Sequence, residues 1–315
     1  MPPATSGNQF KGVQTVEVGP ERDGQRIDNA LSALLKGVPR SLIYRLLRTG
    51  QVRVNGKRAK PDTRLATGDS LRIPPVRTAE REESGAPPTS MVKQVTDGVI
   101  FEDRDFLAID KPAGIASHGG SGVSFGAIEL LRAARPKDHL ELVHRLDRDT
   151  SGLLLFARTR TGLTGVQALI REGEVRKQYL CLLTGRLGRA KFDVNAPLRK
   201  SALSGGERMV RVDHEGKPAL TFFREIERYH DGSLVEATLD TGRTHQIRVH
   251  AAHVGNPVAG DPKYGDREAN KRFRELGLKR LFLHAARFEF ELGGRTYSFS
   301  VPLPDDLRKV LDRLQ

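Results

Sequence analysis

The chain has 315 residues, of which 37% are hydrophobic, so it is long enough for one large domain with an appendage or for two domains. Its formal net charge of +13 indicates a polyanionic partner, either a nucleic acid or an anionic membrane surface. No apolar run approaches the roughly 18 residues of a membrane-spanning helix, no signal segment is recognisable at the start, and the single cysteine, Cys181, excludes an internal disulfide and a cysteine-based metal cluster. We therefore expect a soluble, cytoplasmic protein.

The first part of the chain is predicted to form a small basic domain behind a flexible tail. Residues 1–19 are rich in Pro, Gly, Ser and Thr and lack periodicity, which indicates the tail. In residues 20–75, apolar side chains at helical spacing predict two short helices, and the sequence from Val52 to Gly56 predicts a strand that enters a tight hairpin at Asn55-Gly56. Twelve Lys or Arg stand against five Asp or Glu in residues 21–75, a local charge of +7.

Two short helices, a hairpin and this charge density resemble an S4 RNA-binding module, and the sequence from Gly50 to Gly56 is similar to the signature of that family. The resemblance implies contacts with RNA phosphates, which give affinity and register without reading the base sequence. The candidate contact residues are Arg40, Arg45, Arg48 and Arg53. The alternative is a solvated basic helix pair with no ligand.

A polar linker and a larger second domain are predicted to follow. Residues 76–95 carry a charged run and then Pro, Gly, Ser and Thr, which is typical of a linker. Residues 96–315 contain strand-like runs such as 106–109 and 153–157, and the alternating run 235–239. Because few helices separate these runs, the sequence predicts an α+β domain with a mainly antiparallel sheet.

The most informative stretch runs from His144 to Gly152, where Asp147 stands between two arginines, before a turn and a run that is predicted to be a buried strand. Such a loop can present one carboxylate at the edge of a sheet. Cationic neighbours keep a carboxylate ionised, as a nucleophile or a general base must be at neutral pH. On these grounds alone, a surface cluster of arginine and aspartate that caps a strand explains the same residues.

The order His-Arg-Leu-Asp followed by Thr-Ser-Gly resembles the active-site motif of the RluA-type pseudouridine synthases, and the segment is similar to the RluC branch, which modifies 23S ribosomal RNA. The resemblance implies that Asp147 is the catalytic carboxylate. It also implies that Arg145 fills the space that a target uridine leaves when it flips out of its stack, and that His144 supports the loop. Asp149 is expected in the turn, outside the reaction.

Three further elements of the chain resemble the same family. Lys177-Gln178-Tyr179 matches its lysine-x-tyrosine, which implies that Tyr179 stacks on the target base and is a candidate for removing the C5 proton. Leu283 matches a leucine that packs against the uracil. Residues 243–248 match its Arg-Thr-His-Gln-Ile-Arg element, whose first arginine pairs with the aspartate, so Arg243 is expected to clamp Asp147. Tyr179 and Leu283 are equally compatible with plain core positions.

Four histidines suggest a metal site as an alternative chemistry: His245, His250, His253 and His284. Zinc hydrolases place two histidines at i and i+4 on one helix. Here the spacings are five and three, so the first three cannot share one helical face, and no metal is expected. A glycine-rich stretch at 118–122 lacks the Gly-Lys-Thr/Ser of a nucleotide-binding loop, so an ATP site is not expected either.

Formation of pseudouridine breaks the N1–C1′ bond, turns the uracil and joins C5 to C1′, so it requires one carboxylate and no cofactor, whereas a glycosidase uses two carboxylates. Asp147 either attacks C1′ or takes the 2′-proton to give a glycal. The resemblance implies an enzyme that acts on 23S rRNA or its assembly precursor, and we expect a monomer. The alternatives are a tRNA pseudouridine synthase, a non-catalytic ribosome-associated RNA-binding protein, and a metal-dependent hydrolase acting on RNA.

Overall fold

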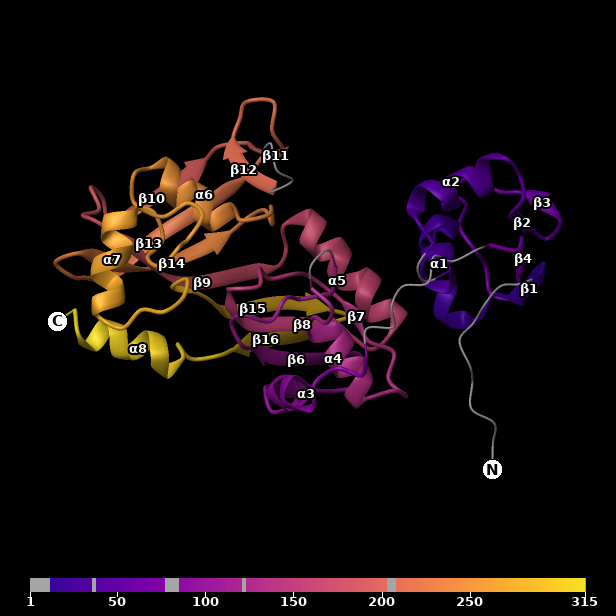
Figure 1. The fold of residues 1–315 in the computed structure, drawn as a ribbon, viewed down its shortest axis with the longest axis horizontal. Helices are drawn as coiled ribbons and strands as arrows, with labels where there is room; N and C mark the ends of the chain where they lie inside the picture. Colours follow the sequence, from indigo (N-terminus) through magenta and orange to yellow (C-terminus); the bar gives the residue numbers. More distant parts are fainter. Residues whose placement is uncertain (1–11, 36–37, 77–84, 121–122, 203–207, 315) are drawn as a thin grey trace. The chain divides into compact units, whose positions relative to one another are not determined.

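The computed structural model describes residues 12–35, 38–76, 85–120, 123–202 and 208–314. The chain divides into two compact units, Met1–Ala86 and Pro87–Gln315, and each is described by itself below (Figure 1). Parts of the predicted tail and linker, residues 1–11 and 77–84, lie outside the described residues.

The N-terminal unit is a four-stranded sheet with two helices. Its sheet has the order β1-β4-β2-β3, and Ile27, Leu31, Ile43 and Leu47 of the two helices lie in its hydrophobic core. In chain order its elements are β1 (Gln14–Glu17), the 3-10 helix η1 (Pro20–Arg22), α1 (Ile27–Leu34), α2 (Arg40–Arg48), β2 (Arg53–Val54), β3 (Lys57–Arg58) and β4 (Ser70–Ile73).

The N-terminal unit shows one confirmed prediction and one difference. Asn55 and Gly56 have φ of 49° and 76° between β2 and β3, the left-handed conformation that a two-residue hairpin of type I′ requires. In contrast, strand β1 lies within residues 1–19, where the sequence predicts a flexible tail. Its register pairs Gln14 with Ile73, so the strand depends on a partner that is distant in the sequence and leaves no local signal.

The second unit is built on a mixed sheet of ten strands (Figure 1). Its strand order is β10-β13-β14-β9-β15-β8-β6-β5, while β16 pairs with β15 and β7 with β8. Neighbouring strands are antiparallel except for β8 and β15, which pair in parallel at His284–Ser151 and Ala285–Gly152. The predicted α+β class with a mainly antiparallel sheet is therefore confirmed.

The elements of this unit, in chain order, are α3 (Thr89–Thr96), β5 (Val99–Glu102), β6 (Phe106–Lys111), α4 (Ala127–Ala134), β7 (Glu141–Leu142), β8 (Ser151–Ala157), α5 (Arg160–Glu172), β9 (Arg176–Thr184), β10 (Lys191–Asn195), β11 (Leu198–Ala202), β12 (Arg208–Val212), β13 (Leu220–Arg228), β14 (Gly232–Leu239), α6 (Gln246–His253), α7 (Arg267–Glu275), β15 (Leu283–Leu292), β16 (Arg295–Ser300) and α8 (Asp305–Asp312). Helix α3 begins inside the predicted linker 76–95, and its Val95 is fully buried. The burial of Val95 stabilises a helix that the polar composition of this segment does not predict.

Strand β9 lies near the middle of the ten-stranded sheet. Its alternation places Tyr179 and Cys181 in the main hydrophobic core together with Ile247 of α6. Strand β8, which β15 separates from β9 in the sheet, is buried at every position, as its apolar sequence predicts. Among the described residues, no helix is both long and apolar enough to cross a membrane.

Candidate active site

The loop that carries Asp147 is held from behind by the segment after β6. The Nζ of the fully buried Lys111 donates to the carbonyls of Ile115 and Arg148 at 2.7 and 3.3 Å, and to that of Pro112. The Ser117 hydroxyl donates to the Leu146 carbonyl and accepts from the Leu146 amide, both at 2.8 Å. Residues 146 and 148 are thus fixed on either side of Asp147. Burial lowers the pKa of Lys111 to about 7, against the opposing charges of Asp149 and Asp147.

Arg248, and not Arg243, holds the Asp147 carboxylate. The Nη1 of Arg248 donates to Oδ2 of Asp147 at 3.2 Å, whereas the Nε of Arg243 donates to the Pro218 carbonyl at 3.0 Å. The prediction that Arg243 clamps Asp147 is therefore wrong. The physical reason is the start of α6 at Gln246, which places the second arginine of the motif inside the first turn and leaves the first arginine before the helix, at the exposed mouth of the site.

Arg248 is itself fixed by a buried ion pair. Its Nε and Nη2 donate to the two carboxylate oxygens of Asp261 at 2.7 and 2.8 Å, and the two side chains are 6% and 0% exposed. Burial by itself raises the pKa of Asp261, but the hydrogen bonds and the charge of Arg248 outweigh burial and hold that pKa below its ordinary value. A bidentate arginine–carboxylate pair of this kind fixes the direction of the guanidinium.

His245 lies beside the carboxylate in an unusual backbone conformation. Its φ of 55° places it in the left-handed region, where residues with a side chain are uncommon and cluster at functional sites. Its Nε2 lies 3.8 Å from Oδ2 of Asp147, and its Nδ1 is hydrogen-bonded to the Tyr264 hydroxyl at 2.8 Å. Burial lowers the pKa of His245, and Arg248 lowers it further, although Asp147 opposes the shift. At neutral pH the ring is therefore uncharged.

Asp147 opens into a cleft of about 720 Å³ with basic walls. Five of the side chains that line it are basic, and Asp147 is the carboxylate among them: the basic residues are Arg145, Arg148, Lys177, Lys200 and Arg243. Such a cleft favours a polyanion over a neutral or cationic ligand.

A smaller pocket, which shares part of its lining with the cleft, contains the predicted catalytic and base-binding residues together. Its lining includes Asp147, Tyr179, Leu283, Arg145 and Arg243, which come from distant parts of the chain. Tyr179 is buried, and burial raises the pKa of its phenol, with a further contribution from the charge of Asp147. The phenol is therefore neutral at neutral pH.

His144 supports the loop, as the sequence analysis expects. Its Nε2 accepts a hydrogen bond from the Leu155 amide at 3.2 Å, and its ring stacks on Phe288 with centroids 4.6 Å apart. Burial lowers the pKa of His144 to about 3, so the ring stays neutral. The other turn carboxylate, Asp149, accepts from the Nε of Arg148 at 3.2 Å.

Three of the four histidines considered as metal ligands, His245, His250 and His284, have separate partners. His250 bonds Thr221 through Nδ1 and the Ala196 carbonyl through Nε2, at 2.9 Å each, and His284 bonds the Ser151 hydroxyl at 3.0 Å. Among the described residues, no group of three or more His, Cys, Asp or Glu side chains is placed to hold a metal ion.

Sequence reasoning missed three residues that build this site: Lys111, Arg248 and Asp261. Lys111 carried a weak signal, since it ends an apolar strand immediately before a Pro-Ala-Gly turn. Arg248 lies within the motif that was recognised, but the motif does not show where the helix begins. Asp261 has no signal, because it meets Arg248 only through the loop that follows α6.

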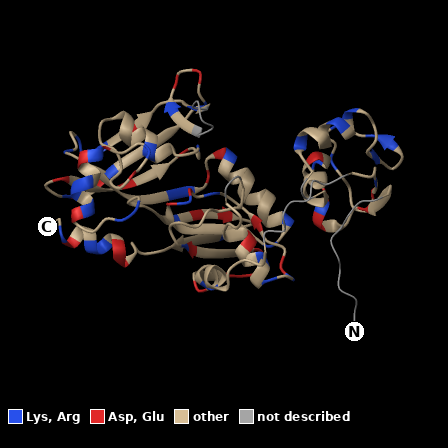
Figure 2. Ribbon diagram, in the orientation of Figure 1, with Lys and Arg blue, Asp and Glu red and all other residues tan. Residues whose placement is uncertain are grey.

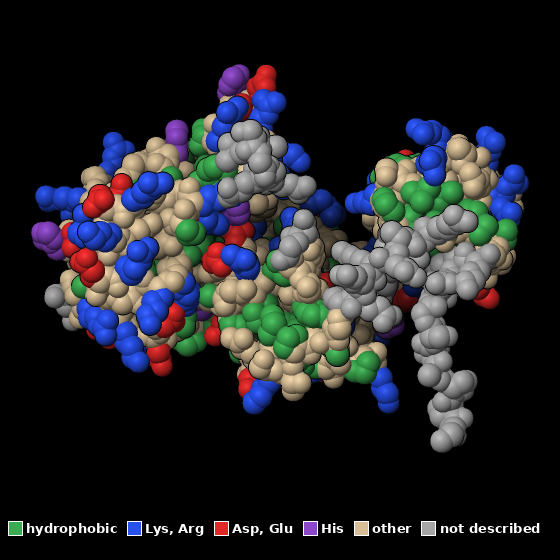
Figure 3. Space-filling model, viewed as in Figure 1, with side chains coloured by type: hydrophobic (Ala, Val, Ile, Leu, Met, Phe, Trp, Pro, Cys, Tyr) green, Lys and Arg blue, Asp and Glu red, His purple; other side chains and the backbone are tan. Residues whose placement is uncertain are grey.

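The four arginines predicted to contact RNA, Arg40, Arg45, Arg48 and Arg53, are exposed. Arg45 and Arg48 lie on α2, where Figure 2 shows a group of basic residues, and Figure 3 shows Lys and Arg on the visible surface of this unit. Arg40 donates to the Asn29 side chain at 3.1 Å, and Arg53 donates to the Gly56 carbonyl at 3.1 Å. Because all four side chains are exposed, their guanidinium groups are accessible to a ligand of this unit.

Known proteins resemble this chain along nearly its whole length. The family model described as RNA pseudouridylate synthase matches residues 105–253, and the S4 domain model matches residues 25–71. The chain is 49% identical over 309 residues to "Ribosomal large subunit pseudouridine synthase C" of Escherichia coli O157:H7, covering 96% of this chain and 97% of that protein. The protein of the same name from Pasteurella multocida is 48% identical over 309 residues, with 97% and 95% covered. Among solved structures, "Human RNA Pseudouridylate Synthase Domain Containing 4" has a TM-score of 0.59 at 25% identity and covers 71% of this chain and 95% of that chain.

Proposed function

The chain belongs to the RNA pseudouridylate synthase family, and from that premise we propose that it isomerises specific uridines of 23S ribosomal RNA to pseudouridine. It is an RNA isomerase by family, and the large-subunit substrate follows from the relatives that it resembles at 49% identity over 309 residues. The observation that carries the proposal is a single carboxylate, Asp147, which lines a basic cleft and is held by Arg248 at 3.2 Å. We further propose that the enzyme acts as a monomer, in the bacterial cytoplasm.

A carboxylate fixed in this way suits a reaction at the sugar of a flipped nucleotide. A uridine inside structured RNA must leave its stack before C1′ is accessible, which costs a few kcal/mol. In our proposal Arg145 occupies the vacated space, Leu283 packs against the uracil, and Tyr179 stacks on its other side. Asp147 then attacks C1′ or removes the 2′-proton. Either route breaks the N1–C1′ bond and releases the uracil as an anion, which turns. C5 then bonds to C1′ as the ester bond between Asp147 and C1′ breaks or, in the glycal route, as Asp147 returns the proton to C2′.

The test of this function is a map of pseudouridines in 23S rRNA from cells that lack the protein, complemented with the wild-type chain or with Asp147→Ala. We expect specific uridines to stay unmodified unless the aspartate is present. A map that the deletion leaves unchanged would remove the large-subunit assignment and direct the same test to tRNA. Loss of modification that Asp147→Ala restores would instead support a non-catalytic RNA-binding protein.

The final step removes the C5 proton, and we propose that the Tyr179 hydroxyl oxygen accepts this proton as the phenol passes its own proton to water, so that the phenol is neutral before and after the step. Tyr179→Phe keeps the stacking ring, so we expect unchanged RNA affinity, a slower product-forming step, and a larger kinetic isotope effect with RNA that carries deuterium at C5. Because burial raises the pKa of Tyr179, its ionisation should produce no limb in the pH–rate profile between about pH 6 and 10. Tyr179→Ala also removes stacking, which is worth about 1–3 kcal/mol. If the phenylalanine variant matches the wild type in rate and isotope effect, only the stacking role remains.

We also propose that residues 20–75 are an RNA-binding domain and residues 96–315 the catalytic domain. In that case Arg45→Gln/Arg48→Gln should weaken RNA binding and flatten its salt dependence, by about 0.7 in the logarithmic slope for each lost phosphate contact with single-stranded RNA. Both arginines are exposed and lie outside the core of α2, so the unfolding midpoint should not change. Binding isotherms at several salt concentrations measure the slope. An unchanged slope would exclude these two residues from the RNA interface.

A further inference from the structure

Lys177 is a buried lysine to which the reaction described above gives no role. It is 6% exposed, it lies on β9 two residues before Tyr179, and it lines the basic cleft. Within the described part of the chain, Asp240 and Arg243 affect Lys177 through charge, but its Nζ takes part in no hydrogen bond or ion pair.

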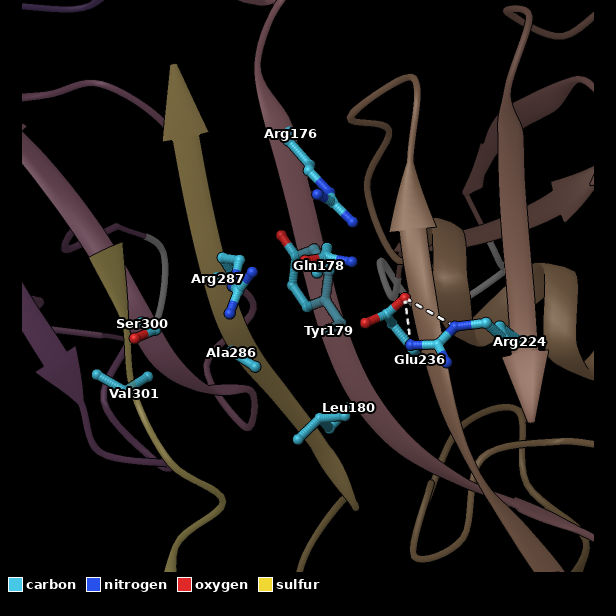
Figure 4. Close-up of a pocket in the computed structure, with 10 residues that line it drawn as sticks. All are labelled: Arg176, Gln178, Tyr179, Leu180, Arg224, Glu236, Ala286, Arg287, Ser300 and Val301. Carbon is cyan, nitrogen blue, oxygen red and sulfur yellow. Dashed lines mark hydrogen bonds and ion pairs between the residues drawn. The ribbon is translucent and has the colours of Figure 1, made fainter. Parts of the chain in front are cut away.

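The other buried lysine and arginine side chains in the described part of this unit, Lys111 and Arg248, have partners. Lys111 donates to backbone carbonyls and Arg248 to two carboxylates. The hollow on the other face of β9 also shows this pairing (Figure 4): Arg224 lies 3.1 Å from Glu236, which is marked there by a dashed line. At the same hollow Arg176 and Arg287 lie 3.6 and 3.8 Å from Glu289. A desolvated charge without an acceptor disfavours folding. The unpaired Lys177 therefore indicates an acceptor that the ligand supplies.

The position of Lys177 shows which part of the ligand it meets. Tyr179 borders the small pocket that also contains Asp147 and Leu283, where the base and sugar of the target fit. Lys177 lines the wide cleft but not that pocket, and two residues along a strand span about 7 Å. An ammonium at this distance from the base-binding tyrosine lies beside the backbone of the RNA and not beside the uracil.

We propose that Lys177 binds the phosphodiester group next to the flipped uridine. This inference rests on the proposed function and specifies how the same cleft holds its RNA. The phosphate supplies a direct anionic partner, which the described residues do not give to Lys177: Asp240 acts on it only through charge. Burial lowers the pKa of Lys177 in the free protein, and a bound phosphate raises it again, so binding at alkaline pH should take up a proton.

The test uses the full chain and a 23S rRNA fragment whose uridine the wild-type enzyme isomerises. Single methylphosphonate linkages, which carry no charge, are placed in turn at each position that flanks the target. For the wild type we expect one linkage to weaken binding about tenfold, or about 1.4 kcal/mol. Lys177→Met should bind the unmodified RNA about tenfold more weakly and lose its sensitivity to that one linkage, while it keeps its sensitivity to the others.

Two controls separate a ligand contact from a structural role. Lys191→Met makes the same substitution at an exposed lysine on β10, which pairs across strands with Arg224 on the opposite face of the sheet, and it should change neither binding nor sensitivity to any linkage. The unfolding midpoint of Lys177→Met should rise, because the variant removes a desolvated charge that has no partner. A lysine retained for stability would give a lower midpoint.

Each outcome decides between the two roles. Equal sensitivity of the wild type and Lys177→Met to every linkage overturns the inference, and so does a variant that fails to fold. The inference is also overturned if Lys177→Met keeps its sensitivity to every linkage but loses the wild type's sensitivity to a change in the target uracil, because Lys177 would then contact the base. If the wild-type chain isomerises no uridine of 23S rRNA, the proposed function fails. This failure is distinguishable from failure of the Lys177 inference, because the binding test uses only RNA that the wild type converts.

Discussion

Asp147→Asn is expected to reduce isomerisation below detection while the fold is retained. The amide has nearly the same shape as the carboxylate, but it can neither attack C1′ nor accept the 2′-proton, so both chemical routes are closed. The substitution leaves Arg248 bonded to Asp261 at 2.7 and 2.8 Å, so no buried charge loses its main partner. We therefore expect an unfolding midpoint within about 2–4 °C of the wild type.

RNA affinity separates this loss of chemistry from a loss of binding. Because the variant removes the negative charge from a basic cleft, affinity for the same RNA should be unchanged or slightly higher. Asp149→Asn is the matched control, since Asp149 lies two residues away in the turn and contacts Arg148. It should retain nearly full turnover. Measurable product from Asp147→Asn, assayed under single-turnover conditions, would disprove the assignment of the catalytic carboxylate.

Arg248→Met is expected to damage both activity and stability. Without the guanidinium, Asp147 loses its hydrogen bond, and a misplaced reacting group commonly lowers the rate by about 10²-fold. The same change leaves the buried Asp261 without its cationic partner, which typically destabilises a fold by about 3–5 kcal/mol. Both effects can be measured on one preparation, by single-turnover kinetics and by chemical denaturation.

A second substitution separates the two effects. Arg248→Met/Asp261→Asn removes both buried charges, so it should recover part of the lost stability without recovering turnover. Arg243→Met is the matched control, because this exposed arginine bonds the Pro218 carbonyl and not Asp147. It should weaken RNA binding and leave stability within about 0.5 kcal/mol. Full turnover in Arg248→Met, with turnover abolished in Arg243→Met, would favour the pairing that the sequence predicts.

The ion pair also has a pH signature. Arg248 holds the pKa of Asp261 below its ordinary value, so the native carboxylate stays ionised at pH values where the unfolded one is protonated. The contribution of the pair to stability is therefore complete above about pH 4 and is lost as the pH falls through the depressed native pKa. In acid-denaturation profiles, the double variant should show a shallower loss of stability in this range than the wild type.

The sequence by itself determined those features whose signal is local. The hairpin at Asn55-Gly56 follows from two residues that tolerate positive φ, and the buried strand β8 follows from its uninterrupted apolar run. The family resemblance at residues 144–152 singled out Asp147, because the surrounding motif is long and specific, and this carboxylate lines the small pocket.

Only the tertiary structure decided which side chains meet that carboxylate. The strand β1 and the helix α3 form through partners that are distant in the sequence, in segments whose composition indicates a tail and a linker. Arg248 replaces Arg243 beside Asp147, because the first residue of α6 determines the direction in which each arginine projects. Asp261 and Lys111 act across long separations. A pattern of residue types specifies local conformation, whereas the choice of one arginine over its neighbour depends on how the loops pack together.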